Sequence, residues 1–271
     1  MLKIYYLASE INPFSGTNTI GSFSKEFSSI LKQNKEIDIR LTQPKYGYVS
    51  DRRYILREVI RLKNLSINFN SKDEIINLKS GFIPNTRVQV YFMEHEEYFK
   101  STGDLLYKSR NGRVYSNNNE RFTFFTKAAI ETLDKLYWIP DYIICNDWQM
   151  SMLPKLFSSK FKNKFKNTKI ISIVHNIDNN YEFDNKLFNS LDLDYNKKLK
   201  KQNTLLDLIE HSDYTYILND ENDSAKKNIQ KNINLKNSLK KGNHNIIDYS
   251  PSLDTSDRVQ VYNDILKKLQ K

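Results

Sequence analysis

The chain of 271 residues has a formal net charge of +10 and is 39% hydrophobic, so it is long enough to bury one large core or two small ones. No apolar run approaches the roughly 18 residues of a membrane span, and no charged leader opens the chain, so we expect neither a membrane segment nor a signal peptide. The single cysteine, Cys145, excludes an internal disulfide, and a reducing cytoplasm is the expected location.

Runs rich in β-branched and aromatic residues alternate with amphipathic stretches along the chain. The runs predict strands at 2–8, 36–42, 65–69, 74–80, 87–93, 141–145, 169–175, 214–218 and 245–249. The amphipathic stretches predict helices at 19–33, 119–137, 148–160, 196–211, 221–231 and 255–269. This alternation favours βαβ units and therefore an α/β fold, a doubly wound, Rossmann-like parallel sheet with helices on both faces.

We interpret residues 1–271 as a single domain of this kind. Closely spaced strands mark 47–93 as a β-rich insertion, and the Asn- and Lys-rich stretch 228–245 is the best candidate for a flexible connection. The terminal helix at 255–269 repeats its apolar residues at i, i+3 and i+4, so we expect it to pack back onto the domain.

The positive charge admits a nucleic-acid-binding function. However, the densest basic stretches, 160–169, 197–201 and 226–241, lie at helix ends or between elements and match no nucleic-acid-binding motif. We interpret them as solvated lysine-rich surface, and we expect no nucleic-acid or membrane partner.

The segment SEINPFSGTNTIG, residues 9–21, connects the first predicted strand to the first predicted helix. This strand–loop–helix order is typical of phosphate cradles, in which backbone N–H groups at a helix N-terminus bind the anion. The loop has only Gly16 and Gly21, and it contains no lysine. The sequence alone leaves open whether it binds phosphate or is simply a turn.

Polar side chains follow several strands of the predicted sheet, where α/β proteins bind their ligands. For three of these residues a purely structural role is the alternative. Asp147 could cap the next helix, and His175 could be a hydrogen-bonded histidine at a strand end. Trp148, which we expect to be exposed, could instead pack in the core. Because they share one edge of one sheet, we favour a functional site. The set comprises Tyr46, Asp147, Trp148, Gln149, His175 and Asn176.

The ordered motifs resemble the N-terminal domain of the glycogen and starch synthase family. The resemblance covers SEINPF (9–14), PKYG (44–47), YFMEHEEYF (91–99), SNNNERFTFFTKAA (116–129), WIPDYIICNDWQ (138–149) and IVHN (173–176). It implies a fold equivalent to the N-terminal half of a GT-B glycosyltransferase. It also implies transfer of glucose from ADP-glucose to an α-1,4-glucan with retention, with the nucleotide sugar as substrate and no metal or cofactor.

By this resemblance His175 and Asp147 are catalytic residues beside the transferred glucose. The resemblance assigns substrate binding to Gly16, Thr17, Tyr46, Trp148, Gln149 and Asn176. Tyr46 and Trp148 could equally be packing groups.

The chain also departs from the family pattern. The family lysine of the first loop falls on Gly16, and its glycine pair falls on Asn18 and Thr19, leaving the hydroxyl and amide donors of Ser15, Thr17 and Asn18 for an anion. We also expect the chain to end where the donor-binding domain would begin. A second glycosyltransferase chain is therefore an expected partner. The alternative function is a non-catalytic glucan-binding or regulatory homologue.

Overall fold

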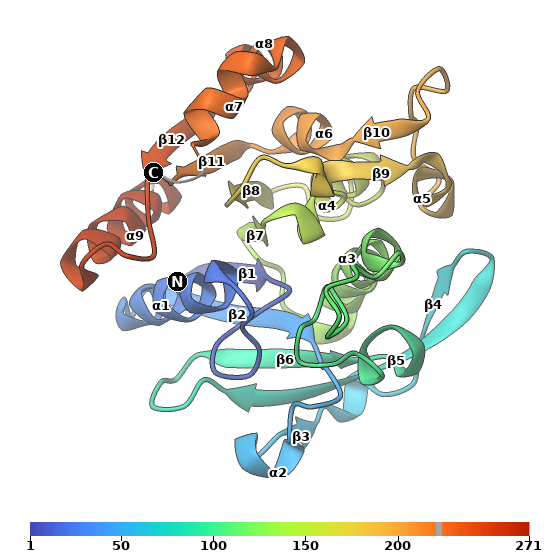
Figure 1. The fold of residues 1–271 in the computed structure, drawn as a ribbon. Helices are drawn as coiled ribbons and strands as arrows, with labels where there is room; N and C mark the ends of the chain where they lie inside the picture. Colours follow the sequence, from blue (N-terminus) through green and yellow to red (C-terminus); the bar gives the residue numbers. More distant parts are fainter. Residues whose placement is uncertain (221–223, 271) are drawn as a thin grey trace.

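A computed structural model describes residues 1–220 and 224–270, and one large sheet dominates it (Figure 1). Within these residues seven strands run parallel, in the spatial order β12-β11-β8-β7-β1-β2-β6. In chain order they are β1 (Leu2–Leu7), β2 (Ile37–Pro44), β6 (Gln89–Glu94), β7 (Tyr142–Asn146), β8 (Lys169–Val174), β11 (Tyr214–Asn219) and β12 (His244–Asp248). The predicted doubly wound parallel sheet is confirmed.

The central strand β1 is flanked by β2 and β7 in parallel register, with Ile4 opposite Ile39 on one side and Tyr142 on the other. Its residues from Ile4 onward are buried, as expected for a strand covered on both faces. The carboxyl ends of β1, β7 and β8 therefore lie side by side at one edge of the sheet.

The segment 47–93 extends this same sheet. The long strand β5 (Lys72–Phe82) runs antiparallel to β6, and it pairs with both β3 (Arg57–Glu58) and β4 (Leu65–Phe69). A short helix, α2 (Asp51–Tyr54), and a 3-10 turn at Ile60–Leu62 connect these strands.

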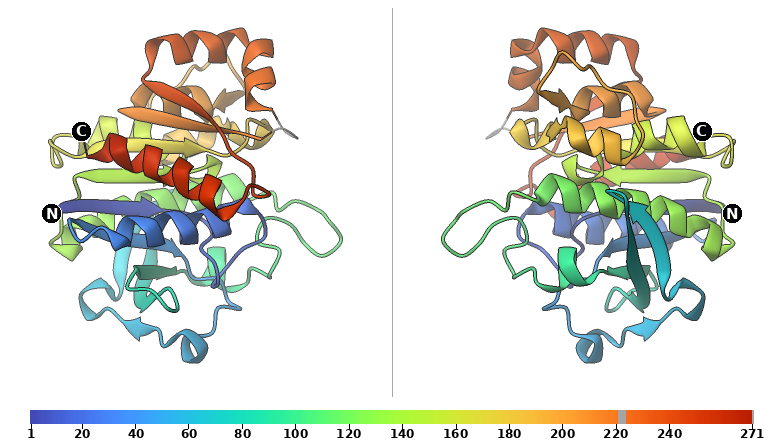
Figure 2. Two further views of the ribbon diagram at one scale, coloured as in Figure 1. Left: turned by 90° about the vertical axis from the view of Figure 1, so that its left-hand side faces the viewer. Right: turned by 90° about the vertical axis from the view of Figure 1, so that its right-hand side faces the viewer.

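Helices cover both faces of the sheet. The helices α1 (Thr19–Gln33) and α9 (Thr255–Leu269) lie on one face, and α3 (Asn118–Leu136) lies on the other (Figure 2). The helix α4 (Leu153–Leu156) contacts both α3 and α6 (Thr204–His211). These helices position the loops at the carboxyl edge.

The terminal helix α9 is fixed to α1 by polar and aromatic contacts. The Tyr262 hydroxyl donates to Glu26 at 3.0 Å, and the Arg258 Nε–H donates to the same carboxylate at 2.9 Å. The ring of Tyr262 lies edge-on to Phe23, with ring centroids 5.2 Å apart. These contacts join two helices from opposite ends of the sequence.

Two of the predicted helices differ in the structure. The predicted helix 148–160 is a 3-10 turn at Trp148–Met150, then α4, then a π-helical turn at Phe157–Phe161, because Pro154 in the first turn of α4 cannot continue a preceding helix. The predicted helix 196–211 begins only at Thr204. Asn203 caps it there, since its Oδ1 accepts the Leu205 N–H at 3.0 Å.

The residues before α6 instead form β10 (Lys201–Asn203), which pairs with β9 (Glu182–Asp184) ahead of the short helix α5 (Asn185–Ser190). The predicted flexible connection 228–245 is wrong. It contains the end of α7 (Ala225–Lys231) and all of α8 (Ile233–Lys241), which buries Leu235 and Leu239 one turn apart. The start of the predicted helix 221–231, residues 221–223, lies outside the described residues.

Candidate functional site

The carboxyl ends of β7 and β8 are joined by Asp147 and His175. Asp147 is 2% exposed, and its Oδ1 accepts the backbone N–H of His175 at 2.9 Å and the Tyr181 hydroxyl at 3.2 Å. Its φ of 67° lies in the left-handed region, which L-residues seldom adopt. This strained position lies at the strand end, where functional residues concentrate.

Burial raises the pKa of the Asp147 carboxyl to about 7, because the charged form loses its hydration; the hydrogen bonds from His175 and Tyr181 oppose this rise. Burial lowers the pKa of His175 to about 3 for the same physical reason. At neutral pH the imidazole is therefore uncharged, and the carboxyl is partly ionised.

The orientation of His175 is set by Asn146 and α1. The Asn146 amide donates to Ser24 Oγ at 3.1 Å, which turns its Oδ1 toward the His175 Nε2 at 2.8 Å. Because Oδ1 can only accept, Nε2 carries the hydrogen of the neutral ring. The edge of the Phe23 ring packs against the imidazole, with centroids 4.9 Å apart.

The opening loop is held closed by Glu10. This carboxylate is fully buried and accepts the backbone N–H of Thr17, the Thr17 hydroxyl at 3.1 Å and the Tyr107 hydroxyl at 2.6 Å. Burial raises its pKa, and the hydrogen bonds from Tyr107 and Thr17 act against the rise. A carboxylate of the chain itself thus occupies the donors that a phosphate cradle offers to an anion.

The other predicted donors of this loop are also engaged. The Ser15 hydroxyl donates to Gln43 Oε1 at 2.9 Å, and Asn18 Oδ1 caps α1 by accepting the Ile20 N–H at 2.8 Å. The expectation that these groups remain for an anion is therefore wrong for Ser15 and Thr17, whereas the side-chain N–H groups of Asn18 have no hydrogen-bond partner within the described residues. Gly16 is exposed, but a Cβ at that position would lie 2.0 Å from Asn12 Oδ1, so any side chain there requires Asn12 to move.

Three of the predicted binding residues, Tyr46, Trp148 and Gln149, are buried beneath the site. Tyr46 is fully buried, and its hydroxyl donates to the Ser9 carbonyl at 2.7 Å. Trp148 is 7% exposed and packs against Tyr107 and Phe122, so the expectation of an exposed tryptophan is wrong.

Gln149 is buried and donates through Nε2 to the Tyr107 hydroxyl at 3.0 Å, while its Oε1 has no hydrogen-bond partner within the described residues. Tyr107 therefore joins Glu10 in the opening loop to Gln149 after β7. The remaining predicted residues, Gly16, Thr17 and Asn176, are exposed at the rim.

Sequence reasoning gave no role to Tyr107 or Tyr181, and it placed Glu10 at the edge without a function. Tyr107 lies in a segment without helical or strand pattern, so no periodicity indicated that its hydroxyl reaches Glu10 and Gln149. Tyr181 follows the His175 loop closely, and this proximity was the only available signal.

Within the part of the chain that the structure describes, no group of three His, Cys, Asp or Glu side chains could hold a metal ion. In the same residues no helix is long and apolar enough to cross a bilayer.

The geometry agrees with the comparisons to known proteins. Residues 3–218 match the model of the starch synthase catalytic domain family. The chain belongs to this family.

Family membership is also visible in full-length relatives. The glycogen synthase of Chlorobium limicola is 33% identical over 177 residues, and that of Chlorobaculum parvum is 31% identical over 188 residues. These alignments cover 65% and 69% of this chain but only 36% and 38% of the relatives. The matched part of the chain thus spans little more than a third of the curated relatives.

A solved structure shows the same fold at low identity. The catalytic domain of Arabidopsis thaliana starch synthase IV, bound to ADP and acarbose, superposes with a TM-score of 0.74 at 20% identity, covering 94% of this chain and 54% of that one. The expected equivalence to part of a GT-B glycosyltransferase is thereby confirmed at the level of the fold.

Proposed function

We propose that this chain is the acceptor-side half of a glucosyltransferase, which transfers glucose from ADP-glucose to the non-reducing end of an α-1,4-glucan with retention of configuration. The observation that supports this most is the joined pair of Asp147 and a neutral His175 at the carboxyl edge of the sheet. Ligands of open α/β sheets bind at this edge, and the family membership supports the same reaction class.

We propose His175 and Asp147 as the catalytic residues. Glycosyl transfer develops positive charge on the sugar ring, which an imidazolium would oppose and a neutral imidazole does not. An ionised Asp147 would stabilise that charge; burial raises its pKa to about 7, so only part of the Asp147 population is ionised at neutral pH. At the rim, Gly16, Thr17 and Asn176 are proposed to bind substrate. Below them, Gln149 is buried, and it contacts the site through its hydrogen bond to the Tyr107 hydroxyl.

The departing diphosphate needs positive charge that this edge lacks. The loops after β1, β7 and β8, residues 8–18, 146–149 and 175–178, contain no Lys or Arg. The Thr17 N–H is already bound by Glu10. We therefore propose that the cations come from a donor-binding unit outside the described residues, in a partner glycosyltransferase or in further sequence. No metal or cofactor is required, and a cytoplasmic location suits these substrates.

Transfer of radiolabelled glucose from ADP-glucose to glycogen tests this proposal, with the chain alone and mixed with a candidate donor-domain glycosyltransferase. Incorporation should fall at least about a hundredfold in His175→Gln and in Asp147→Asn. Losses of this order follow the removal of one group that stabilises charge in a transition state. It should persist in Lys166→Gln, an exposed control. Absence of incorporation in every mixture, or full activity of His175→Gln, would overturn the proposal.

A non-catalytic glucan-binding or regulatory role is the second candidate, and the Glu10–Thr17 contact favours it because it fills the phosphate-binding donors. Affinity electrophoresis in gels that contain glycogen separates the two functions. Retarded migration together with no glucose transfer in any mixture would support the binding role. Transfer by the chain alone, or by a mixture in which His175→Gln abolishes it and the partner alone is inactive, would exclude it.

A further inference from the structure

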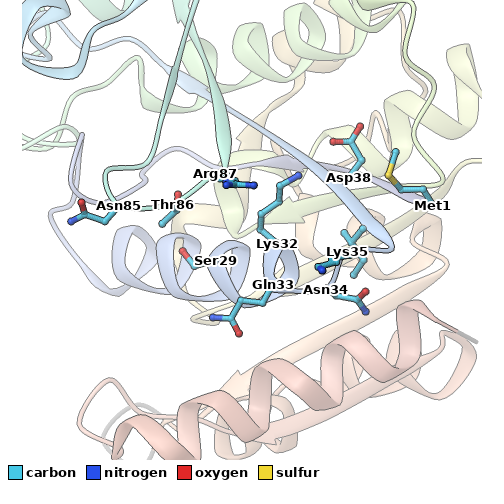
Figure 3. A pocket seen from close by; sticks show the side chains of 11 residues that line it. Met1, Ser29, Lys32, Gln33, Asn34, Lys35, Asp38, Asn85, Thr86 and Arg87 are labelled. Carbon is cyan, nitrogen blue, oxygen red and sulfur yellow. The ribbon is translucent and has the colours of Figure 1, made fainter.

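A hollow lies at the opposite edge of the sheet from Asp147 and His175. Its volume is about 820 Å³, and it lies among the amino ends of β1 and β2, the last turns of α1 and the turn between β5 and β6 (Figure 3). This volume lies within the range of small-molecule sites in proteins. The hollow is lined by Met1, Ser29, Lys32, Gln33, Asn34, Lys35, Ile37, Asp38, Asn85, Thr86 and Arg87.

Three basic side chains line this hollow without counter-charges. Within the described residues, Lys32, Lys35 and Arg87 form no ion pair or hydrogen bond through their side chains. By contrast, in the hollow beside β6 the lining lysines are paired, Lys45 with Asp51 at 3.0 Å and Lys100 with Glu96 at 2.7 Å. The hollow beside β6 therefore has its lining cations neutralised, whereas the hollow at the amino ends of β1 and β2 brings together three that are not.

The one lining carboxylate, Asp38, is already engaged. Its Oδ2 accepts the Trp138 indole N–H at 2.8 Å and lies 3.7 Å from the Arg40 guanidinium. It therefore does little to neutralise the three lining cations. The carboxyl end of α1 contributes about half a negative charge, which is much less than three positive side chains.

The side chains of Lys32 and Arg87 extend into the same space from α1 and from the turn before β6 (Figure 3). The turn is fixed by Thr86, whose hydroxyl donates to the Ile83 carbonyl at 2.8 Å and accepts the Val88 N–H at 3.1 Å. These bonds fix the backbone on either side of Arg87. Its side chain faces the like charge of Lys32, and a bound anion would relieve the repulsion between them.

Neutral amides also line the hollow. Asn34 Oδ1 accepts the Glu36 N–H at 2.9 Å, which leaves its amide N–H groups free. The side chains of Gln33 and Asn85 have no hydrogen-bond partners within the described residues. Amides that can donate and accept are suited to sugar hydroxyls, whereas guanidinium and ammonium groups are suited to phosphate.

We propose that this hollow binds a small phosphorylated sugar, with its phosphate between Lys32 and Arg87 and its hydroxyls on the amides of Gln33, Asn34 and Asn85. The site is distinct from the proposed transfer site, since the two lie at opposite edges of the sheet. The inference therefore does not depend on the transfer reaction.

Isothermal titration calorimetry of the full chain tests the site, with inorganic phosphate, glucose 1-phosphate and glucose as probes. Inorganic phosphate and glucose 1-phosphate should bind saturably, the latter more tightly, and glucose should not bind. Lys32→Gln and Arg87→Gln should each weaken glucose 1-phosphate binding about tenfold, as expected for one charge-assisted contact. Lys166→Gln, an exposed lysine outside the hollow, should change it less than about twofold.

We expect all three variants to fold, because none of the three side chains is buried. Circular dichroism of each variant checks this. Absence of saturable phosphate binding by the unmodified chain would overturn the proposal. Equal weakening by Lys166→Gln would show a general charge effect and would also overturn it. Glucose 1-phosphate binding no tighter than inorganic phosphate would contradict the assignment of the amides to a sugar.

Discussion

Asp147 and His175 have pKa values shifted in opposite directions, which predicts an unusual pH dependence of stability. The pKa of His175 falls from 6.5 to about 3 on folding, so the unfolded chain takes up its proton first and stability falls as the pH drops below 6.5. The pKa of Asp147 rises from 3.8 to about 7, so the folded chain takes up its proton first and stability rises as the pH drops from 7 toward 4.

The two effects are of similar size. When the pH falls from 7.5 to 4.5, the pKa shift of His175 lowers the unfolding free energy by about 3 kcal/mol, at 1.36 kcal/mol per pKa unit. The pKa shift of Asp147 raises the unfolding free energy by about 3 kcal/mol over the same range. In the unmodified chain this pair should therefore contribute almost no pH dependence. Each single variant should expose the contribution of the remaining partner.

Urea unfolding followed by circular dichroism at pH 7.5, 6.0 and 4.5 measures this. Relative to the unmodified chain, the unfolding free energy of His175→Gln should rise by about 3 kcal/mol when the pH is lowered from 7.5 to 4.5. That of Asp147→Asn should fall by about 3 kcal/mol over the same range. The glutamine side chain in the first variant keeps an N–H for Asn146, so packing changes little. Parallel pH profiles for the three proteins would refute this reasoning, as would an NMR titration of the folded imidazole near pH 6.5.

Further predictions concern stability and burial. Glu10→Ala should lower the unfolding free energy by about 1–3 kcal/mol in urea, because Thr17 and Tyr107 lose their acceptor; an unchanged midpoint would show that the loop is not held by Glu10. Leu239→Ala should cost about 2–4 kcal/mol, since this side chain is 4% exposed on α8; no loss would restore the flexible-connection interpretation. Trp138 and Trp148 are both buried, so acrylamide should quench their fluorescence weakly until the chain unfolds; strong quenching of the folded chain would place an indole in solvent.

The central strands of the sheet could be predicted from the sequence because they are buried on both faces. Continuous apolar runs such as residues 143–145 identify such strands without long-range information. The terminal helix was also predicted with the bounds that the structure shows, whereas α8 was not. The polar composition of 233–241 hides the two leucines that pack inward, and their partners lie on a distant element.

The position of the site in the fold could be predicted from the sequence, but the hydrogen bonds and packing contacts within it could not. Strand order alone places Asp147 and His175 at one edge. The burial of Trp148 and the engagement of Thr17 depend on Tyr107, Phe122 and Glu10, which reach the site from separate segments. Such contacts are set by tertiary packing, which local sequence patterns do not encode.

The junction of α1 with α9 has a consequence for the order in which the molecule forms. His175 packs on Phe23, and Phe23 packs on Tyr262, so the environment of the imidazole is complete only after the last helix has docked. A chain that still lacks α9 therefore lacks the contact between Tyr262 and Phe23, and the packing around the His175 imidazole is incomplete until that helix is present.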